Sequence, residues 1–211
     1  MNSTRFLLRC GIVAGLVYIT LGVVQVLFRQ GFDVRRHALS LLSNGDNGWI
    51  QISNFLVSGV LVIAGAVGAR RLLRGGKAGT WGPILLGLYG IGLIGAGIFV
   101  ADPGRGFPPG APEVTTMTRN GLMHFVFGGI GFYALIAVCF VFARRYAAQG
   151  RSGWVMYSTF TGAAFLCAFA AIASGSTSVL AMLAFYVAVA WVWLWHTAVL
   201  VTLHIEATHR P

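Results

Sequence analysis

Apolar residues fill six long stretches of the chain, separated by short polar segments. The stretches cover residues 10–28, 49–69, 81–100, 121–142, 154–174 and 179–203. A helix needs ~20 apolar residues to cross the ~30 Å hydrocarbon layer of a bilayer, and each stretch is close to that length. The pattern therefore predicts an all-α polytopic transmembrane bundle of six helices, forming a single domain over residues 1–211, with both termini on one side of the membrane.

The polar segment after the first stretch, residues 32–48, carries a shorter amphipathic pattern. Its apolar residues recur at helical spacing: Val34, Ala38, Leu41 and Leu42. Asp33 is a favourable N-cap, and the Asn44-Gly45 pair is a typical helix stop. The segment is predicted to form a short interfacial helix along the membrane surface, acting either as a simple tether or as a lid over a site.

Composition supports a membrane environment. The chain is 57% hydrophobic and 9% charged, which is too apolar for a water-soluble domain of 211 residues. The first stretch ends in the bulky Val26, Leu27 and Phe28 followed by Arg29, without the small residues of a signal-peptide cleavage site. It is therefore expected to be retained as the first span.

The net charge of +10 is explained by topology. If the N-terminus is cytoplasmic, ten of the fifteen basic residues fall in cytoplasmic segments: Arg5, Arg9, Arg70, Arg71, Arg74, Lys77, Arg144, Arg145, Arg151 and Arg210. The outer loops then hold most of the carboxylates: Asp33, Asp46, Asp102 and Glu113. Cytoplasmic loops are enriched in Lys and Arg. This predicts a plasma (inner) membrane protein with both termini cytoplasmic, in contact with anionic lipid and without a nucleic-acid partner.

Glycine is frequent within the apolar stretches. Gly11 and Gly15 form a GxxxG motif, and six glycines crowd the third stretch: Gly82, Gly87, Gly90, Gly92, Gly95 and Gly97. Small residues let membrane helices approach closely. The same pattern fits packing within one chain, a homo-oligomer, or docking of a membrane partner.

Ionisable residues at membrane depth are expensive and therefore mark candidate sites. Asp102 and His124 lie at the outer ends of neighbouring stretches, and His37 and Ser40 lie one turn apart in the first outer loop. Asn54 lies near the start of the second stretch, at the same depth. We expect these polar groups to converge on one level beneath the outer surface.

Several interpretations of these residues remain open. His37, Asp102 and His124 match a ligand set of catalytic zinc, although no HExxH-type spacing supports a metal. Ser40 could act as a nucleophile activated by His124 and Asp102, although no GxSxG motif surrounds it. The same groups, with arginines such as Arg36 and Arg119, could bind an anionic headgroup without chemistry. In the purely structural interpretation, Asp102 caps a helix or pairs with an arginine, and His124 bonds a loop carbonyl.

His196 lies deep in the sixth stretch, nearer the cytoplasmic end than His124. A bis-histidine haem site needs two histidines at one depth, so haem is not expected. We expect His196 to bond a hydroxyl on another helix.

Three ordered motifs carry a family resemblance: GFDVRRHALSLLSNGDNGWIQISNFLVSG, GAGIFVADPGRGFPPG and NGLMHFVFGG. Over roughly Gly31 to Gly129, the chain resembles the bacterial integral membrane proteins grouped as domain of unknown function 998. The resemblance implies a multi-pass helical membrane protein without an established activity. It selects the following positions: His37, Ser40, Leu41, Asn54, Phe55, Asp102, Pro103 and His124.

The sequence thus predicts a membrane protein with a polar pocket at its outer face. The pocket is expected to bind a lipid headgroup or a small polar ligand through these residues: His37, Ser40, Asn54, Asp102, His124, Arg36 and Arg119. The alternatives are a membrane-embedded hydrolase, with or without a metal, and a structural subunit of a membrane complex.

Overall fold

The computed structural model describes residues 2–73, 75–111 and 116–209. Six α-helices form the fold: α1 (Asn2–Phe28), α2 (Gly48–Leu72), α3 (Gly76–Ile98), α4 (Arg119–Ala148), α5 (Ser152–Ala173) and α6 (Val179–Thr208). Each is long and apolar enough to cross a membrane. The predicted class, an all-α polytopic bundle of six helices, is confirmed. Arg74, Glu113 and Arg210, which contributed to the charge pattern, lie outside the described residues.

The helices extend past the apolar stretches mainly at one end. α1 begins at Asn2, α4 continues to Ala148 and α6 continues to Thr208, each several residues beyond its apolar stretch. Hydrocarbon thickness limits only the apolar part of a helix, because backbone hydrogen bonding can continue into water.

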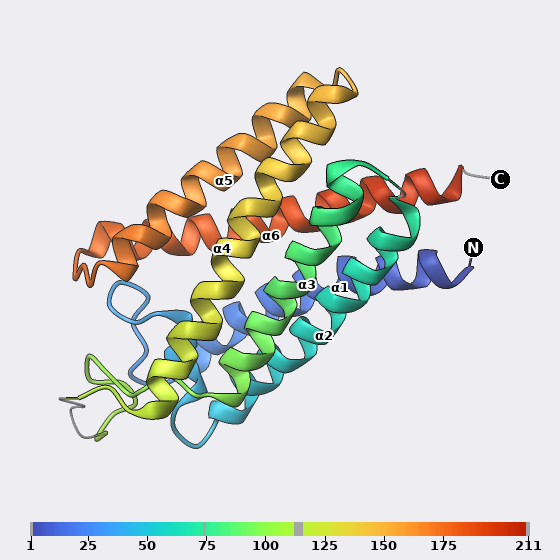
Figure 1. Cartoon of the computed structure of the whole chain (residues 1–211). Coiled ribbons are helices and arrows are strands. Elements are labelled where there is room, and N and C mark those ends of the chain that lie inside the picture. The colour runs from blue at the N-terminus through green and yellow to red at the C-terminus, as the bar shows by residue number, and fades with distance from the viewer. Residues whose placement is uncertain (1, 74, 112–115, 210–211) are drawn as a thin grey trace.

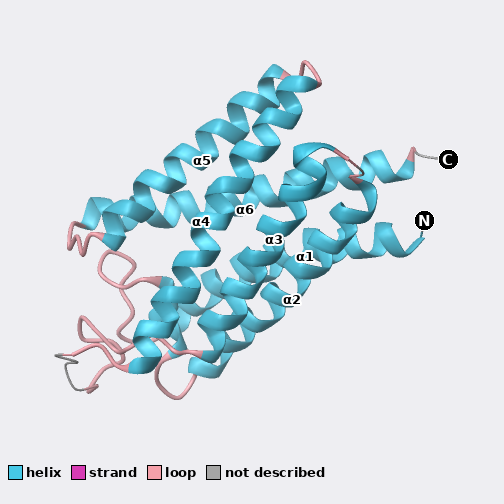
Figure 2. Cartoon of the chain, in the orientation of Figure 1, coloured by secondary structure: helices cyan, strands magenta, loops and turns pink. Residues whose placement is uncertain are grey.

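The helices run alternately up and down, as Figures 1 and 2 show. The described residues of three connections, 29–47, 99–111 with 116–118, and 174–178, lie at one end, here called the loop end. Both termini and the two short connections, α2–α3 and α4–α5, lie at the opposite end, here called the terminus end. Each helix packs against its successor in sequence, and α6 also packs against α1.

Aromatic side chains fill the centre of the bundle. The rings of Tyr18 on α1 and Trp193 on α6 stack with centroids 4.6 Å apart, and Tyr89 of α3 lies 5.5 Å from Trp193. Trp195 contacts Phe142 of α4 and donates a hydrogen bond to Ser158 of α5. One helix, α6, therefore connects both halves of the bundle.

Glycines occupy the closest helix crossings. A Cβ on Gly11 of α1 would lie 2.8 Å from the Cα of Gly65 on α2, and a Cβ on Gly92 of α3 would lie 2.6 Å from the Cα of Gly131 on α4. These glycine faces therefore serve contacts within this chain, as small residues do in membrane bundles.

The helix predicted in the first outer loop is shorter than expected. A 3₁₀ helix, η1, spans only Leu39–Ser43, and its N-cap is Ala38. The prediction of Asp33 as the N-cap of this helix is wrong, because η1 begins only after Ala38. The Asp33 carboxylate accepts the backbone N–H of Arg35 and the Asp33 carbonyl accepts that of His37, as at an N-cap. This cap serves a single turn, which the extended backbone at Ala38 separates from η1.

Candidate functional site

Hydrogen bonds join the three loop segments at the loop end. Arg29 donates to the carbonyl oxygen of Leu42 at 3.1 Å, and Asn44 donates to the carbonyl of Ala101 at 3.0 Å. The guanidinium of Arg105 donates to the carbonyls of Arg36 and Ser176, both at 3.2 Å. The three connections at the loop end, which are the predicted outer loops, therefore form one cap over the helices.

His37 holds the first outer loop in place. Its Nδ1 accepts the backbone N–H of Asp33 at 2.9 Å, so the proton of the neutral ring lies on Nε2 and is donated to the carbonyl of Arg105 at 3.0 Å. The ring is 3% exposed and lies 5.4 Å from the Phe32 ring and 5.5 Å from the Phe107 ring. Both ring nitrogens are therefore hydrogen-bonded to backbone groups.

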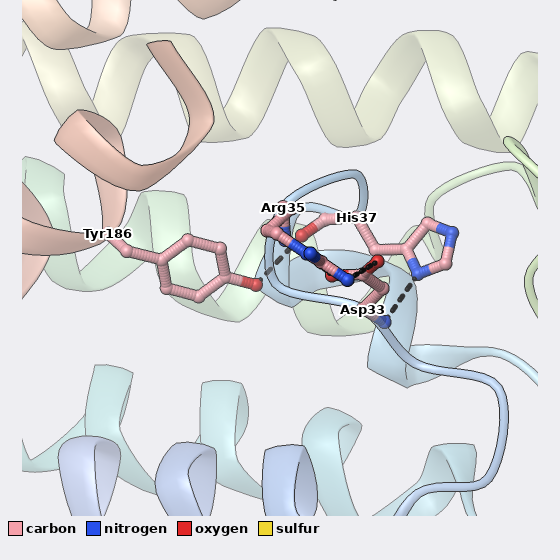
Figure 3. Close-up of polar contacts among 4 residues, drawn as sticks. All are labelled: Asp33, Arg35, His37 and Tyr186. Carbon is pink, nitrogen blue, oxygen red and sulfur yellow. Dashed lines mark hydrogen bonds and ion pairs between the residues drawn. The ribbon is translucent and has the colours of Figure 1, made fainter. Parts of the chain in front are cut away.

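Tyr186 ties the same loop to α6. Figure 3 shows its ring reaching from α6, and its hydroxyl donates to the carbonyl of His37 at 2.8 Å. On the neighbouring turn, Arg35 pairs with Asp33 at 3.2 Å. The backbone hydrogen bond from Arg35 is the main cause that lowers the pKa of the Asp33 carboxyl, and the Arg35 side chain adds to it.

Asp102 stabilises the start of α4. Its carboxylate accepts the backbone N–H of Thr118 at 2.8 Å and also the Thr118 hydroxyl. The Thr118 oxygen in turn accepts the N–H of Gly121 at 3.1 Å, which makes Thr118 the N-cap of the helix. A Cβ on Gly121 would collide with the Asp102 carboxylate, so a glycine is needed there.

His124 joins α4 to the end of α3. Its Nδ1 lies 3.0 Å from the carbonyl oxygen of Ala96 and 2.9 Å from that of Phe99. Because carbonyl oxygens only accept, Nδ1 carries the proton. The ring is 7% exposed and satisfies carbonyls that the helix end leaves without intrahelical partners. Its Nε2 accepts no hydrogen bond from a described residue.

Asn54 belongs to a buried cluster of side-chain amides between α1 and α2. It donates to the carbonyl of Tyr18 at 3.1 Å and to the Gln51 side chain at 3.3 Å, and it accepts from Ser58. Gln25 donates to Gln51 at 2.8 Å. The sequence interpretation did not single out Gln25 and Ser58, although both are polar residues inside apolar stretches, which is the signal that could have found them.

The remaining predicted residues lie near the surface. Ser40 lies in η1, where its carbonyl accepts from the Ser43 hydroxyl, and its own hydroxyl bonds no described residue. Arg36 is exposed in the first outer loop and Arg119 is exposed in the first turn of α4. Neither guanidinium makes a hydrogen bond or ion pair with the described part of the chain.

The predicted site residues therefore bond to separate partners. The ring of Phe55 lies 6.2 Å from the His124 ring and 6.1 Å from the Tyr18 ring, which places an aromatic side chain beside His124. Within residues 2–73, 75–111 and 116–209, no three His, Cys, Asp or Glu side chains form a group that could hold a metal ion. The zinc and serine-nucleophile hypotheses stay predictions.

An apolar groove lies between α1 and α6 at the loop end. It has a volume of ≈ 180 Å³ and is lined on the helices by residues that include Tyr18, Gly22, Val26 and Tyr186. Val34 and Leu39 of the first outer loop also line it. The loop held by His37 and Tyr186 therefore forms part of the groove's wall.

His196 differs from its prediction. It is 1% exposed, and its ring meets Trp193 edge-on at 5.3 Å. Neither ring nitrogen has a hydrogen-bond partner among the described residues, so the expected bond to a hydroxyl is wrong. Neighbouring side chains on α6, such as Trp195 with Ser158, make the interhelical bonds instead.

Comparison with known proteins gives one match. The family model described as "Protein of unknown function (DUF998)" matches residues 12–202, which confirms the resemblance and extends it over the last two helices. Neither the curated proteins nor the solved structures include a match.

Proposed function

The chain belongs to the DUF998 family, whose description assigns no function, and we propose from its geometry that this multi-pass membrane protein binds a lipid at the loop end. The observation that carries the proposal is the groove between α1 and α6, which is apolar along its length and bordered by a polar loop. This combination matches a molecule with an acyl chain and a polar headgroup.

The groove supports binding of an acyl chain. Its helix walls come from α1 and α6, and its volume of ≈ 180 Å³ equals that of about six water molecules at ~30 Å³ each. This space accommodates part of one chain rather than a whole lipid. Gly22 keeps the groove open, because a Cβ there would lie 3.3 Å from the Leu39 side chain.

The first outer loop supplies groups for a headgroup. Val34 lines the groove, and the exposed Arg36 follows it by two residues. Arg35 is already paired with Asp33, whereas the guanidinium of Arg36 bonds no described residue and is available to a phosphate or carboxylate. Ser40, whose hydroxyl also bonds no described residue, lies next to the groove residue Leu39. His37 and Tyr186 act in this proposal as positioning residues that hold the loop.

The proposal includes an orientation. The loop end faces the extracytoplasmic side and both termini lie in the cytoplasm, because the terminus end, with the termini and the two short connections, carries ten of the fifteen Lys and Arg residues. The bound lipid would then come from the outer leaflet of the plasma membrane.

Photo-crosslinking with a phospholipid that carries a diazirine on its acyl chain tests the groove. Ala190 lines the groove, and Ala190→Phe should fill it and reduce crosslinking to α1 and α6 at least severalfold. Ala184→Phe is the matched control, because Ala184 is also exposed on α6 and does not line the groove. Equal crosslinking in both variants would exclude the groove as the binding site.

The headgroup contact is tested separately by lipid titration of Arg36→Gln and Arg119→Gln. Both arginines are exposed at the loop end, but only Arg36 is close in sequence to the groove. Loss of one charge–phosphate contact should weaken binding of an anionic phospholipid by about tenfold in Arg36→Gln, with little change in Arg119→Gln. Weaker binding in Arg119→Gln, with little change in Arg36→Gln, would instead place the headgroup at the start of α4.

A further inference from the structure

A second and larger cavity lies at the terminus end, on the opposite side of the membrane from the proposed lipid groove. It has a volume of ≈ 700 Å³ and lies between the α2–α3 connection and the last turns of α4. Its lining includes Lys77, Arg144 and Arg145, and none of its described lining residues is acidic. The cavity therefore has a positive wall.

Two of these cations are available to a ligand. Lys77 and Arg144 are exposed, and neither side chain makes a hydrogen bond or ion pair with a described residue. Arg145 is different, because its guanidinium pairs with Glu206 of α6 at 2.7 Å. That pair neutralises Arg145 and anchors the end of α4 to α6, which leaves Lys77 and Arg144 to face the cavity from two sides.

The start of α3 adds backbone donors to the same wall. Gly75, Gly76 and Gly79 line the cavity, and the N-cap Gly75 has no side chain to accept from the first-turn N–H groups. Gly75 and Gly76 have φ of +80° and +70°, a conformation that side chains disfavour. Arg70 holds this turn by donating to the carbonyl of Gly79 at 2.7 Å.

The other wall of the cavity is apolar. Trp81 of α3 and Phe140 of α4 line it and are 54% and 41% exposed. Phe140 lies two turns before the exposed end of α4, on the side of the cavity that faces the bilayer centre. A soluble anion would leave these rings uncovered, whereas a phospholipid would cover them with its acyl chains.

We propose that this cavity binds the phosphate of an anionic phospholipid from the leaflet at the terminus end. Lys77, Arg144 and the first-turn N–H groups of α3 bind the phosphate oxygens, and Trp81 and Phe140 pack against the acyl chains. Charge complementarity selects anionic lipids, since basic cavities between membrane helices bind such headgroups. The site is separate from the groove between α1 and α6 and does not depend on it.

Native mass spectrometry of the purified full-length protein tests the site. Titration with phosphatidylglycerol should show a tightly bound molecule that remains in Ala190→Phe, in which the groove between α1 and α6 is filled, and its affinity should be at least tenfold above that for phosphatidylcholine. Lys77→Gln together with Arg144→Gln should weaken phosphatidylglycerol binding by about tenfold or more, as expected for loss of two charges near the membrane surface.

The matched control is Arg9→Gln together with Arg71→Gln. These exposed arginines also lie at the terminus end and do not line the cavity, so the control removes the same charge and should keep binding. Equal weakening of binding in both double variants would show that general surface charge attracts the lipid, and it would overturn the proposal. The comparison of the two lipids on Ala190→Phe, which leaves the cavity unaltered, tests the proposal even if a double variant fails to fold.

A competition arm distinguishes lipid from soluble phosphate. Inorganic phosphate at millimolar concentration should leave the bound phosphatidylglycerol in place, because it cannot cover Trp81 and Phe140. Displacement of the lipid by inorganic phosphate would assign the cavity to a soluble phosphate compound and overturn the lipid assignment.

Discussion

At the scale of single residues, the polar side chains that the sequence marked as site candidates, from their expected depth in the membrane, bond mainly to backbone groups. His37 bonds the N–H of Asp33 and the carbonyl of Arg105, Asp102 bonds the N–H of Thr118, and His124 bonds carbonyls at the end of α3. Sequence could predict that these groups need partners. One of its interpretations had Asp102 capping a helix and His124 bonding a loop carbonyl. Sequence could not select that interpretation over a shared pocket, because a backbone acceptor leaves no trace in residue identity.

His37→Ala should loosen the cap at the loop end. The change removes two hydrogen bonds of ~0.5–1.5 kcal/mol each and the ring packing against Phe32 and Phe107, so we expect a loss of about 2–3 kcal/mol. Hydrogen exchange should show faster exchange in residues 33–44, with little change in α2. His209→Ala, which removes an exposed histidine at the end of α6, should leave exchange there unchanged. Unaltered exchange in His37→Ala would refute the anchoring role.

Asp102→Ala should weaken the start of α4. Loss of a capping interaction costs ~1 kcal/mol, and Thr118→Ala should cost a similar amount because the two side chains form one chain of hydrogen bonds to Gly121. Thermal unfolding of the single and double variants should therefore be non-additive. Lipid crosslinking to the groove between α1 and α6 should persist in Asp102→Ala. Additive unfolding effects would mean that the two residues act independently.

At the scale of elements, apolar stretches predicted six helices because hydrocarbon thickness sets the length of a span. The apolar pattern did not predict the length of the helix in the first outer loop. Apolar spacing favoured one helix from Asp33, but the side chain of Asp33 bonds the N–H of Arg35 and only Leu39–Ser43 becomes helical. Asp33 caps only one turn, and a segment this short does not sustain a longer helix without tertiary packing, so the extended backbone at Ala38 interrupts it.

Close helix crossings at glycine give a prediction for α3. In Gly92→Ala the new Cβ would lie 2.6 Å from the Cα of Gly131, and separating the two helices should cost about 1–3 kcal/mol. Gly87→Ala is a control in the same helix, because nothing lies within 4 Å of a Cβ there. Its stability should stay within about 0.5 kcal/mol or rise slightly. Thermal unfolding in detergent measures both, and equal stabilities would show that the α3–α4 crossing tolerates a wider separation.

At the scale of the whole molecule, an even number of spans predicts that both termini lie at the same end of the bundle, and Figure 1 shows them there. The two cavities were beyond the reach of the sequence. The groove needs α6 beside α1. The basic cavity lies between the consecutive helices α3 and α4, whose pairing follows from the order of spans although the open space between them does not. Hydropathy gives helix order along the chain but carries no information on which distant helices pack together.

Membrane orientation decides which leaflet each cavity meets, and cysteine labelling measures it. In a background where Cys10, Cys139 and Cys167 are replaced by alanine, Asn47→Cys places a thiol at the exposed loop end, and Ala147→Cys places one at the exposed end of α4. The excess of Lys and Arg at the terminus end predicts that this end is cytoplasmic. A membrane-impermeant maleimide should therefore label Asn47→Cys in intact cells and Ala147→Cys only after lysis.

The reverse labelling pattern would have a specific consequence. The basic cavity with Lys77 and Arg144 would then open to the outer leaflet, and the groove beside Arg36 would open to the inner one. Anionic lipids that bind Lys and Arg are concentrated in the cytoplasmic leaflet, so the cavity would face the leaflet that holds fewer of its ligands. Phosphatidylglycerol binding in detergent would be unchanged, because it depends on the cavity and not on the membrane. The labelling experiment thus separates the chemistry of the cavity from its location in the cell.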